Sequence, residues 1–266
     1  MSPKVSVLMP NYNCEKYISK AIESILSQSF IDFEFIIIDD ASTDGSWATI
    51  QEYAKRDSRI RVYQNEINLW IHKTRNRLIE LSRCPYIALF DSDDISLPDR
   101  IVMELDFLEK NPEYGICGTN FDIIDNDAHI KSSKIFPEFD EDIRRSFFFR
   151  NPFGQNTVML RKECFDSVGV YDESFEVAED LDMWVRIGVC YKMYNIQKNL
   201  VQYRIHGNNS ILKRQKEMIK NTLKIRRQAM QLGYTIDRKW QIYYIGTWCM
   251  QFFPSRLVLW LFNKLI

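Results

Sequence analysis

Residues 86–94 read YIALFDSDD, an apolar run followed at once by three carboxylates in four positions. The run from Tyr86 to Phe90 is typical of a buried strand. Side chains two residues apart in an extended chain point the same way, so Asp91 and Asp93 can offer oxygens to one hard cation. Mg²⁺ or Mn²⁺ is the ion that such a pair favours. The stretch therefore predicts a metal site at the end of a buried strand.

An ordinary acidic turn is the alternative, because Asp-rich turns often follow strands and Leu97–Arg100 is typical of a helix start. From this stretch alone the two interpretations are about equally supported. An EF-hand calcium loop is disfavoured, since the sixth position counted from Asp91 is Ser96 instead of Gly and the twelfth is Val102 instead of Glu.

Composition indicates one large domain, or one domain with an appendage. The 266 residues are 45% hydrophobic and 14% aromatic, which is enough to bury a large core and excludes a disordered chain. The six cysteines lie far apart without a Cys-x-x-Cys, and the N-terminus lacks a basic stretch followed by an apolar one. We therefore expect a reducing, cytoplasmic location without a signal peptide.

Charge is distributed unevenly along the chain. Residues 211–266 carry 11 Lys and Arg against 2 Asp and Glu, a net charge of +9 that leaves −10 for residues 1–210. We predict a domain boundary there, with a main domain over 1–210 and an appendage over 211–266. The acidic main domain argues against a groove for nucleic-acid phosphates.

Strand, polar turn and helix alternate along the first hundred residues, which predicts a parallel sheet. Apolar runs at Val5–Met9, Phe35–Ile38 and Ile60–Tyr63 precede the one at Tyr86–Phe90. The carboxylates after these runs should meet at one edge of the sheet, where open α/β sheets bind ligands. The chain has no glycine-rich dinucleotide or phosphate-binding loop, so bound phosphates would need a metal to neutralise them.

Four segments resemble, in this order and spacing, the motifs of family 2 glycosyltransferases: VSVLMPNYN at 5–13, IDDASTDGS at 38–46, DSDD at 91–94 and EDLDMW at 179–184. Each is weak alone, but the set is specific and extends over about residues 4–210. The resemblance implies an α/β domain with the GT-A fold, a Rossmann-like, mostly parallel central sheet flanked by helices, followed by a C-terminal helical appendage. It also implies transfer of a sugar from a nucleotide-sugar with inversion at the anomeric carbon.

The same resemblance implies a donor site formed by the first three motifs. Tyr12 would lie against the base, Asp40 would accept a base N–H, and Arg75 matches a basic position that can reach the base in relatives. The remaining residues implied for this site are Pro10, Asn11, Asn13, Asp91 and Ser92. The alternatives are that Tyr12 covers the first helix and that Asp40 caps the second.

The metal would be held by Asp93 with Asp91 nearby, acting as a Lewis acid for the charge that develops on the leaving diphosphate. Asp91 would also touch the ribose. His206 matches a histidine that lies near the metal and diphosphate in relatives, which suits an imidazole as ligand or donor. A solvated loop histidine is the alternative.

Acid–base chemistry is implied for Glu179 and Asp180. Asp180 matches the base that takes the proton of the acceptor hydroxyl, and Glu179 would support the pocket or meet the acceptor. An acidic first turn of a helix beginning near Val177 is the alternative. Residues 151–161 resemble the segment that borders the sugar and acceptor sites, although Gln155 stands where relatives often carry His.

The appendage is basic and rich in aromatic residues, and we expect a helical hairpin broken at Pro254. Its apolar stretches are shorter than about 18 residues, so we do not expect it to span a bilayer. Its composition suits peripheral contact with the inner face of an anionic cell membrane, where a lipid-linked acceptor would lie. Packing onto the main domain or into a homodimer is equally supported.

Together these features predict a metal-dependent inverting glycosyltransferase of surface polysaccharide synthesis. It would move a hexose from UDP to a hydroxyl of a glycan or lipid-linked acceptor, because Tyr12 with Asp40 suits a pyrimidine; dTDP donors are the competitor. A Mg²⁺-dependent phosphatase is an alternative, although such enzymes usually carry the acidic pair on their first strand and here it follows the fourth. A catalytically inactive sugar-nucleotide-binding scaffold is another.

Overall fold

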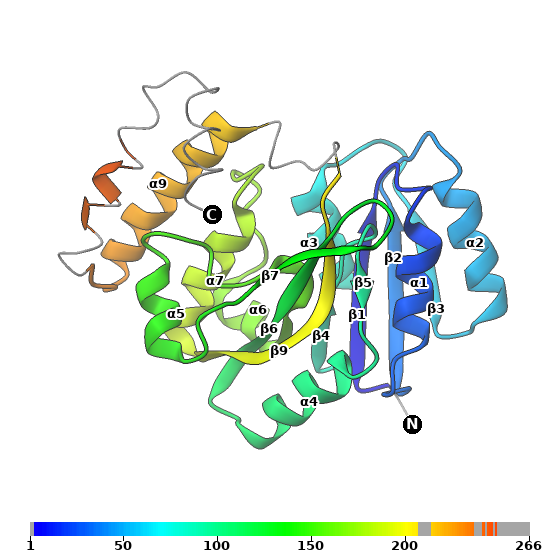
Figure 1. Cartoon of the computed structure of the whole chain (residues 1–266), viewed down its shortest axis with the longest axis horizontal. Helices are drawn as coiled ribbons and strands as arrows, with labels where there is room; N and C mark the ends of the chain where they lie inside the picture. The colour runs from blue at the N-terminus through cyan, green and yellow to red at the C-terminus, as the bar shows by residue number, and fades with distance from the viewer. Residues whose placement is uncertain (1–2, 207–213, 237–240, 243, 247, 249–266) are drawn as a thin grey trace.

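The computed structural model describes residues 3–206, 214–236, 241, 242, 244–246 and 248. A mixed sheet forms its centre, with strand order β3-β2-β1-β4-β8-β6-β9-β5 and β7 paired to β6. Figure 1 shows α1 and α2 at one end of the molecule and α5, α7 and α9 at the other. The predicted α/β architecture, with a central sheet flanked by helices, is confirmed.

The first half of the chain forms the parallel part of the sheet. Strand β1 pairs with β2 and β4, and β2 pairs with β3, all in parallel. Helices α1 to α3 connect these strands. The bounds are β1 Val5–Asn11, α1 Ile18–Leu26, β2 Phe33–Asp39, α2 Ser46–Arg56, β3 Ile60–Gln64, α3 Ile71–Leu81 and β4 Tyr86–Leu89.

The second half extends the sheet in mixed orientation. Strand β8 is antiparallel to β4 and β6, β7 to β6 and β5 to β9, whereas β6 and β9 are parallel. The strands are β5 Ile95–Ser96, β6 Tyr114–Ile124, β7 Ile130–Lys134, β8 Met159–Arg161 and β9 Lys192–Arg204. The helices are α4 Arg100–Lys110, α5 Asp140–Ser146, the 3₁₀ turn η1 Gln155–Thr157, α6 Glu163–Val168, α7 Glu179–Cys190 and α9 Gln215–Gln231.

Both faces of the parallel part are buried. Leu8 of β1 packs with Ile36 on one face, whereas its neighbours Val7 and Met9 pack with Ile22 of α1 on the other. This explains why the strands appear in the sequence as continuous apolar runs instead of alternating ones.

A buried arginine fixes the end of β4, from which the acidic motif begins. The Arg100 guanidinium donates to the carbonyls of Leu89 at 2.7 Å and Val158 at 3.3 Å, and it pairs with Glu104 one turn along α4. Both charged side chains are fully buried, so they must remain paired. The turn that carries the three carboxylates therefore starts from a rigid point.

Helix α9 packs against α7, with its Ile225 and Ala229 buried in the same apolar cluster as Trp184. Asn221 Nδ2 donates to the carbonyl of Val177 at 3.0 Å. The boundary near residue 210 stays a prediction, and the expected break at Pro254 lies outside the described residues. Among the helices that the structure describes, none is long and apolar enough to cross a membrane.

Candidate active site

The predicted donor residues meet at the carboxyl edge of the parallel strands. Pro10 and Asn11 end β1, directly beside the end of β2. Asn11 Nδ2 donates to Asp39 Oδ1 at 2.8 Å, and the Asp40 amide donates to the Asn11 carbonyl at 2.7 Å. Asp39 belongs to the second motif, but we predicted no chemical role for it. In the structure it holds the end of β1 to the end of β2.

Asn13 closes this edge in a left-handed conformation, with φ 49°. Its amide donates to Ser42 Oγ at 2.9 Å, and its Oδ1 accepts from the Thr43 amide at 2.8 Å. These two bonds fix the loop after β1 to the loop after β2. The neighbouring Tyr12 is 49% exposed, so about half of its surface is open to solvent.

Asp40 is buried and does not cap α2. Its Oδ1 accepts from Asn65 Nδ2 at 2.6 Å and from the Leu69 amide at 2.9 Å, which brings the loop after β3 to the same edge. At the start of α2 the amide of Ser46 donates instead to Asp44 Oδ1 at 3.0 Å. The binding of a base by Asp40 and Tyr12 stays a prediction.

Arg75 joins two motifs that are far apart in the sequence. Its Nη1 donates to Glu179 Oε1 at 2.6 Å, and its Nη2 donates to Asp91 Oδ1 at 3.1 Å. The residue is only 7% exposed, and its guanidinium carbon lies 6.0 Å from the centroid of the Tyr171 ring. In this structure Arg75 thus faces the acids of both motifs, and its contact with a nucleobase stays a prediction.

Burial dominates the protonation of this cluster. It raises the pKa of Glu179 to about 7, against the opposing effect of the Arg75 charge, and the nearby Asp180 raises it further. Burial likewise raises the pKa of Asp91, with Arg75 opposing and Asp93 reinforcing the change. Arg75 therefore limits how far two buried carboxyls shift toward their neutral forms.

Asp180 lies in the first turn of α7, which begins at Glu179, two residues after the predicted start. Its Oδ2 accepts from Asn151 Nδ2 at 2.6 Å and its Oδ1 accepts from the Leu181 amide at 2.8 Å. Burial raises its pKa, while these two donors and the Arg75 charge lower it. The carboxylate is therefore held in a fixed orientation and is a stronger base than an exposed aspartate.

Asp93 and His206, the two residues predicted to lie nearest the metal, are side by side in the structure. His206 Nε2 lies 2.9 Å from Asp93 Oδ2. This is the distance of a direct hydrogen bond, and a carboxylate oxygen and an imidazole nitrogen are also groups that Mg²⁺ or Mn²⁺ accepts as ligands. The His206 side chain is only 14% exposed, unlike a solvated loop histidine.

Asp94 turns away from this pair. Its carboxylate accepts from the Arg204 amide at 2.7 Å and from Asn156 Nδ2, and it is buried. Burial, reinforced by Asp93 and Asp91, raises its pKa well above the ordinary value. The third acid of the motif therefore fixes the turn to β9, and metal binding by Asp91 and Asp93 stays a prediction.

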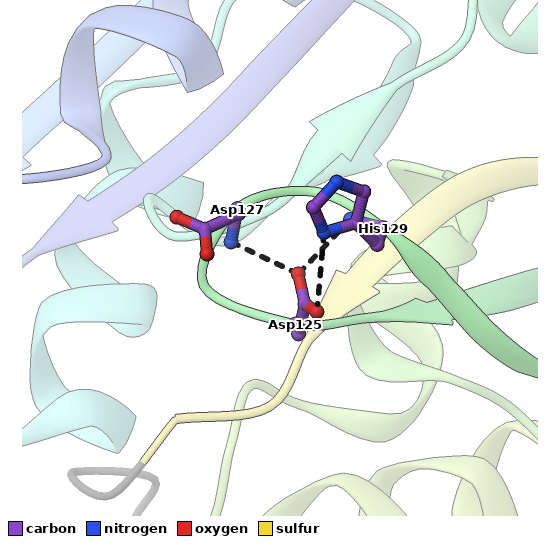
Figure 2. A group of neighbouring side chains, drawn as sticks. All are labelled: Asp125, Asp127 and His129. Atoms are coloured by element: carbon purple, nitrogen blue, oxygen red, sulfur yellow. Dashed lines mark hydrogen bonds and ion pairs between the residues drawn. The ribbon is translucent and has the colours of Figure 1, made fainter.

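A second group of potential ligands, Asp125, Asp127 and His129, lies at the turn between β6 and β7 (Figure 2). The Asp125 carboxylate accepts from the amides of Asp127 at 2.9 Å and His129 at 3.0 Å and pairs with Lys131 at 2.7 Å. The bond from Lys131 lowers its pKa. The Asp125 oxygens are therefore engaged in bonds within the turn.

A family model described as glycosyl transferase family 2 matches residues 6–169. The chain belongs to this family. It is 34% identical over 216 residues to a Bacillus subtilis protein named as the glycosyltransferase EpsE, covering 80% of the chain and 76% of that protein. It is 29% identical over 210 residues to the O-antigen biosynthesis glycosyltransferase WbnJ of Escherichia coli, covering 77% and 81%. The protein is a glycosyltransferase, and the phosphatase alternative is set aside.

Solved structures confirm the GT-A fold. TarS residues 1–349 from S. aureus, solved in complex with UDP, matches 96% of this transferase with a TM-score of 0.70 and 18% identity, over 73% of its own chain. The mannosyltransferase PcManGT from Pyrobaculum calidifontis, solved with GDP-Man and Mn²⁺, matches 94% with a TM-score of 0.67 and 14% identity, over 70% of its own chain. At these identities the likeness shows the fold alone.

Several contacts of the site were not predicted from the sequence. Asn151 orients Asp180, Asn156 and Arg204 hold Asp94, and Gln155 Nε2 donates to the Tyr171 hydroxyl at 2.7 Å. The available signal was the group of amide side chains within residues 151–156, in an otherwise apolar stretch. Their partners lie far away in sequence, so only the tertiary structure identifies them.

Substitution of Arg75 by Gln should destabilise the enzyme in a pH-dependent way. Without the cation, the pKa values of Asp91 and Glu179 rise further above their unfolded values. Such acids stabilise the fold while protonated, and this contribution is lost as pH rises through the folded pKa. We expect a loss of roughly 3–5 kcal/mol in unfolding free energy near pH 8, shrinking toward about pH 5 because Glu179, with a pKa of about 7, binds a proton.

Urea unfolding at the two pH values measures this effect. Arg56→Gln is the matched control, because Arg56 is exposed and forms a surface pair with Glu52 beside the Tyr53 ring, so its removal should cost less than about 1 kcal/mol. A deficit for Arg75→Gln that does not depend on pH would contradict the assigned ion pairs.

Proposed function

We propose that this glycosyltransferase moves a hexose from UDP, with inversion, to a hydroxyl of a glycan or lipid-linked acceptor in surface polysaccharide synthesis. The observation that carries the proposal is the Arg75 bridge between Asp91 and Glu179. It places the predicted donor motif and the predicted base in one buried cluster. The O-antigen name of the relative WbnJ supports the class of product.

Asp180 is proposed as the base. Inversion requires a carboxylate that takes the acceptor proton while the acceptor oxygen attacks the anomeric carbon from the face opposite the leaving diphosphate. Asn151 and the Leu181 amide hold the Asp180 oxygens, so its carboxylate needs no reorientation during the reaction. Glu179 keeps Arg75 beside Asp180 and so maintains the charge balance of the pocket.

Asp93, Asp91 and His206 are proposed to hold Mn²⁺ or Mg²⁺. The ion would supply Lewis-acid stabilisation for the departing nucleoside diphosphate. Asp93 pairs with His206 at 2.9 Å, and Asp91, two residues earlier in the same turn, pairs with Arg75 through one carboxylate oxygen. The Mn²⁺ bound by the mannosyltransferase of the same fold supports this assignment.

The donor nucleotide is proposed to lie over Pro10, Asn11, Asn13 and Ser92, with its base between Tyr12 and Asp40. The exposed ring of Tyr12 offers a stacking face at the rim, and Asp40 presents an acceptor at the same edge. UDP is preferred because TarS binds it in this fold, and GDP and dTDP are the competitors because PcManGT binds GDP-Man.

A membrane-facing role is proposed for residues 211–266. Lys216, Lys220, Lys224 and Arg227 are exposed on α9 and are spaced as one face of a helix. Exposed apolar side chains follow at Leu232, Ile242, Ile245 and Trp248. A basic helix face with adjacent apolar groups suits the surface of an anionic bilayer, and a homodimer is the alternative occupant.

Two substitutions should distinguish the role of the catalytic base from the role of the metal. Asp180→Asn should keep donor binding nearly intact and lower turnover by about 10²–10⁴-fold, the contribution of a general base. Asp93→Ala should weaken donor binding by at least about tenfold in Mn²⁺ while changing it little in EDTA. Calorimetry with UDP-, GDP- and dTDP-sugars measures binding, and release of the nucleoside diphosphate measures turnover.

Asp106→Asn is the control for both variants, because Asp106 lies exposed on α4 and forms a surface pair with Lys110. A fully active Asp180→Asn enzyme would overturn the base assignment. Equal donor affinity in Mn²⁺ and in EDTA would show that donor binding does not need a metal. If no donor binds, the inactive scaffold is favoured.

Charge reversal on α9 should test the membrane role without removing core packing. Lys216→Glu, Lys220→Glu and Arg227→Glu together should weaken sedimentation with phosphatidylglycerol vesicles by roughly 100-fold, since each basic residue contributes about 1 kcal/mol. The matched control reverses Lys20, Lys55 and Lys198, which are exposed elsewhere. Equal binding by the two triple variants would rule out this face as the membrane contact.

A further inference from the structure

One tyrosine ring lies between the proposed metal ligand His206 and the β6–β7 turn. Tyr17 immediately precedes α1, and its ring centroid is 5.2 Å from that of the His206 imidazole, with an angle of 30° between the planes. Its hydroxyl donates to Asn126 Oδ1 at 2.7 Å. The phenol thus connects the imidazole to the β6–β7 turn.

Arg204 completes the connection from the same strand that leads to His206. Its guanidinium carbon lies 4.7 Å from the Tyr17 ring centroid. Its Nη1 donates to the carbonyls of Asp125 at 2.7 Å and Asn126 at 3.2 Å, and its Nε donates to the carbonyl of Asp93 at 2.8 Å. One side chain therefore touches the aromatic ring, the turn and the backbone of the other ligand.

The turn itself is stiffened by the acidic group in Figure 2. Asp125 satisfies the amides of Asp127 and His129 and pairs with Lys131, so the tip is held from within. A rigid tip presents Asn126 to the Tyr17 hydroxyl at a fixed point. The acidic turn can therefore support Tyr17 without binding an ion itself.

We propose that Tyr17 is a positioning residue for the metal site, holding the His206 imidazole beside Asp93 with the β6–β7 turn as its support. The inference rests on the proposed function, because it takes Asp93 and His206 as ligands. These two residues are 113 positions apart, and their side chains meet at 2.9 Å. Partners behind metal ligands commonly contribute 10–100-fold in metal affinity.

Titration of Mn²⁺ into the full chain, alone and with UDP or GDP, tests the inference through the electron paramagnetic resonance signal of free Mn²⁺. Tyr17→Leu should lower the Mn²⁺ affinity by roughly tenfold or more. Tyr17→Phe keeps the ring and loses only the bond to Asn126, so a smaller loss of about two- to tenfold is expected. Asn126→Ala should match it, and combining the two should add little.

Two controls separate positioning from general damage. In a His206→Ala background, Tyr17→Leu should cause little further loss, because the residue through which it acts is gone. Tyr53→Leu is the matched control, since Tyr53 also bonds a neighbouring helix through its hydroxyl, at Glu23, away from the metal ligands. Its Mn²⁺ affinity should equal that of the wild type.

The outcomes are distinct. Wild-type binding of Mn²⁺ with unchanged affinity in Tyr17→Leu, or an equal loss in Tyr53→Leu, overturns the positioning role alone. If the wild-type protein binds no Mn²⁺ under any of these conditions, the metal-dependent part of the proposed function is wrong. The positioning role of Tyr17 is then wrong as well.

Discussion

A single buried guanidinium determines how the two halves of this glycosyltransferase meet. Arg75 lies within hydrogen-bond distance of Asp91 and Glu179, and its charge also acts on Asp180. Carboxylates gathered in a dry site repel one another and shift toward their neutral forms unless a cation is present. Pairing both nitrogens of the guanidinium therefore brings three elements together: α3, the turn after β4 and the start of α7.

The sheet provides the second constraint. Parallel strands β1, β2 and β4 end at one edge, so the loops that follow them converge. Bonds of Asn11 with Asp39 and Asp40, and of Asn13 with Thr43, fix the loops after β1 and β2 to each other. On the other side, β9 returns the chain to the acidic turn and delivers Arg204 and His206 to it. The proposed donor-binding loops thus follow the parallel strands, whereas the proposed metal ligands come from both parts of the sheet, Asp93 after β4 and His206 after β9.

Local pattern was enough to predict the parallel half, because apolar runs followed by polar turns reveal buried strands and their carboxyl ends. The expectation that Asp91 and Asp93 face one ion came from the same kind of argument, since alternate residues of an extended segment share a direction, and it stays a prediction. The pairing of β8 with β4 and β6 could not be predicted, because three residues give too short a pattern. The partners of Arg75, Asp180 and Asp94 were hidden for a different reason: each lies far along the chain, so only the fold brings them together.

The central claim is that one divalent ion binds between Asp93 and His206. Crystals of the full chain grown with Mn²⁺ and UDP, measured for anomalous scattering at the manganese edge, would locate the ion directly. We expect a single strong peak within bonding distance of Asp93 and His206, close to Asp91. A peak at Asp125, Asp127 and His129, or none at the acidic turn after β4, would contradict the account.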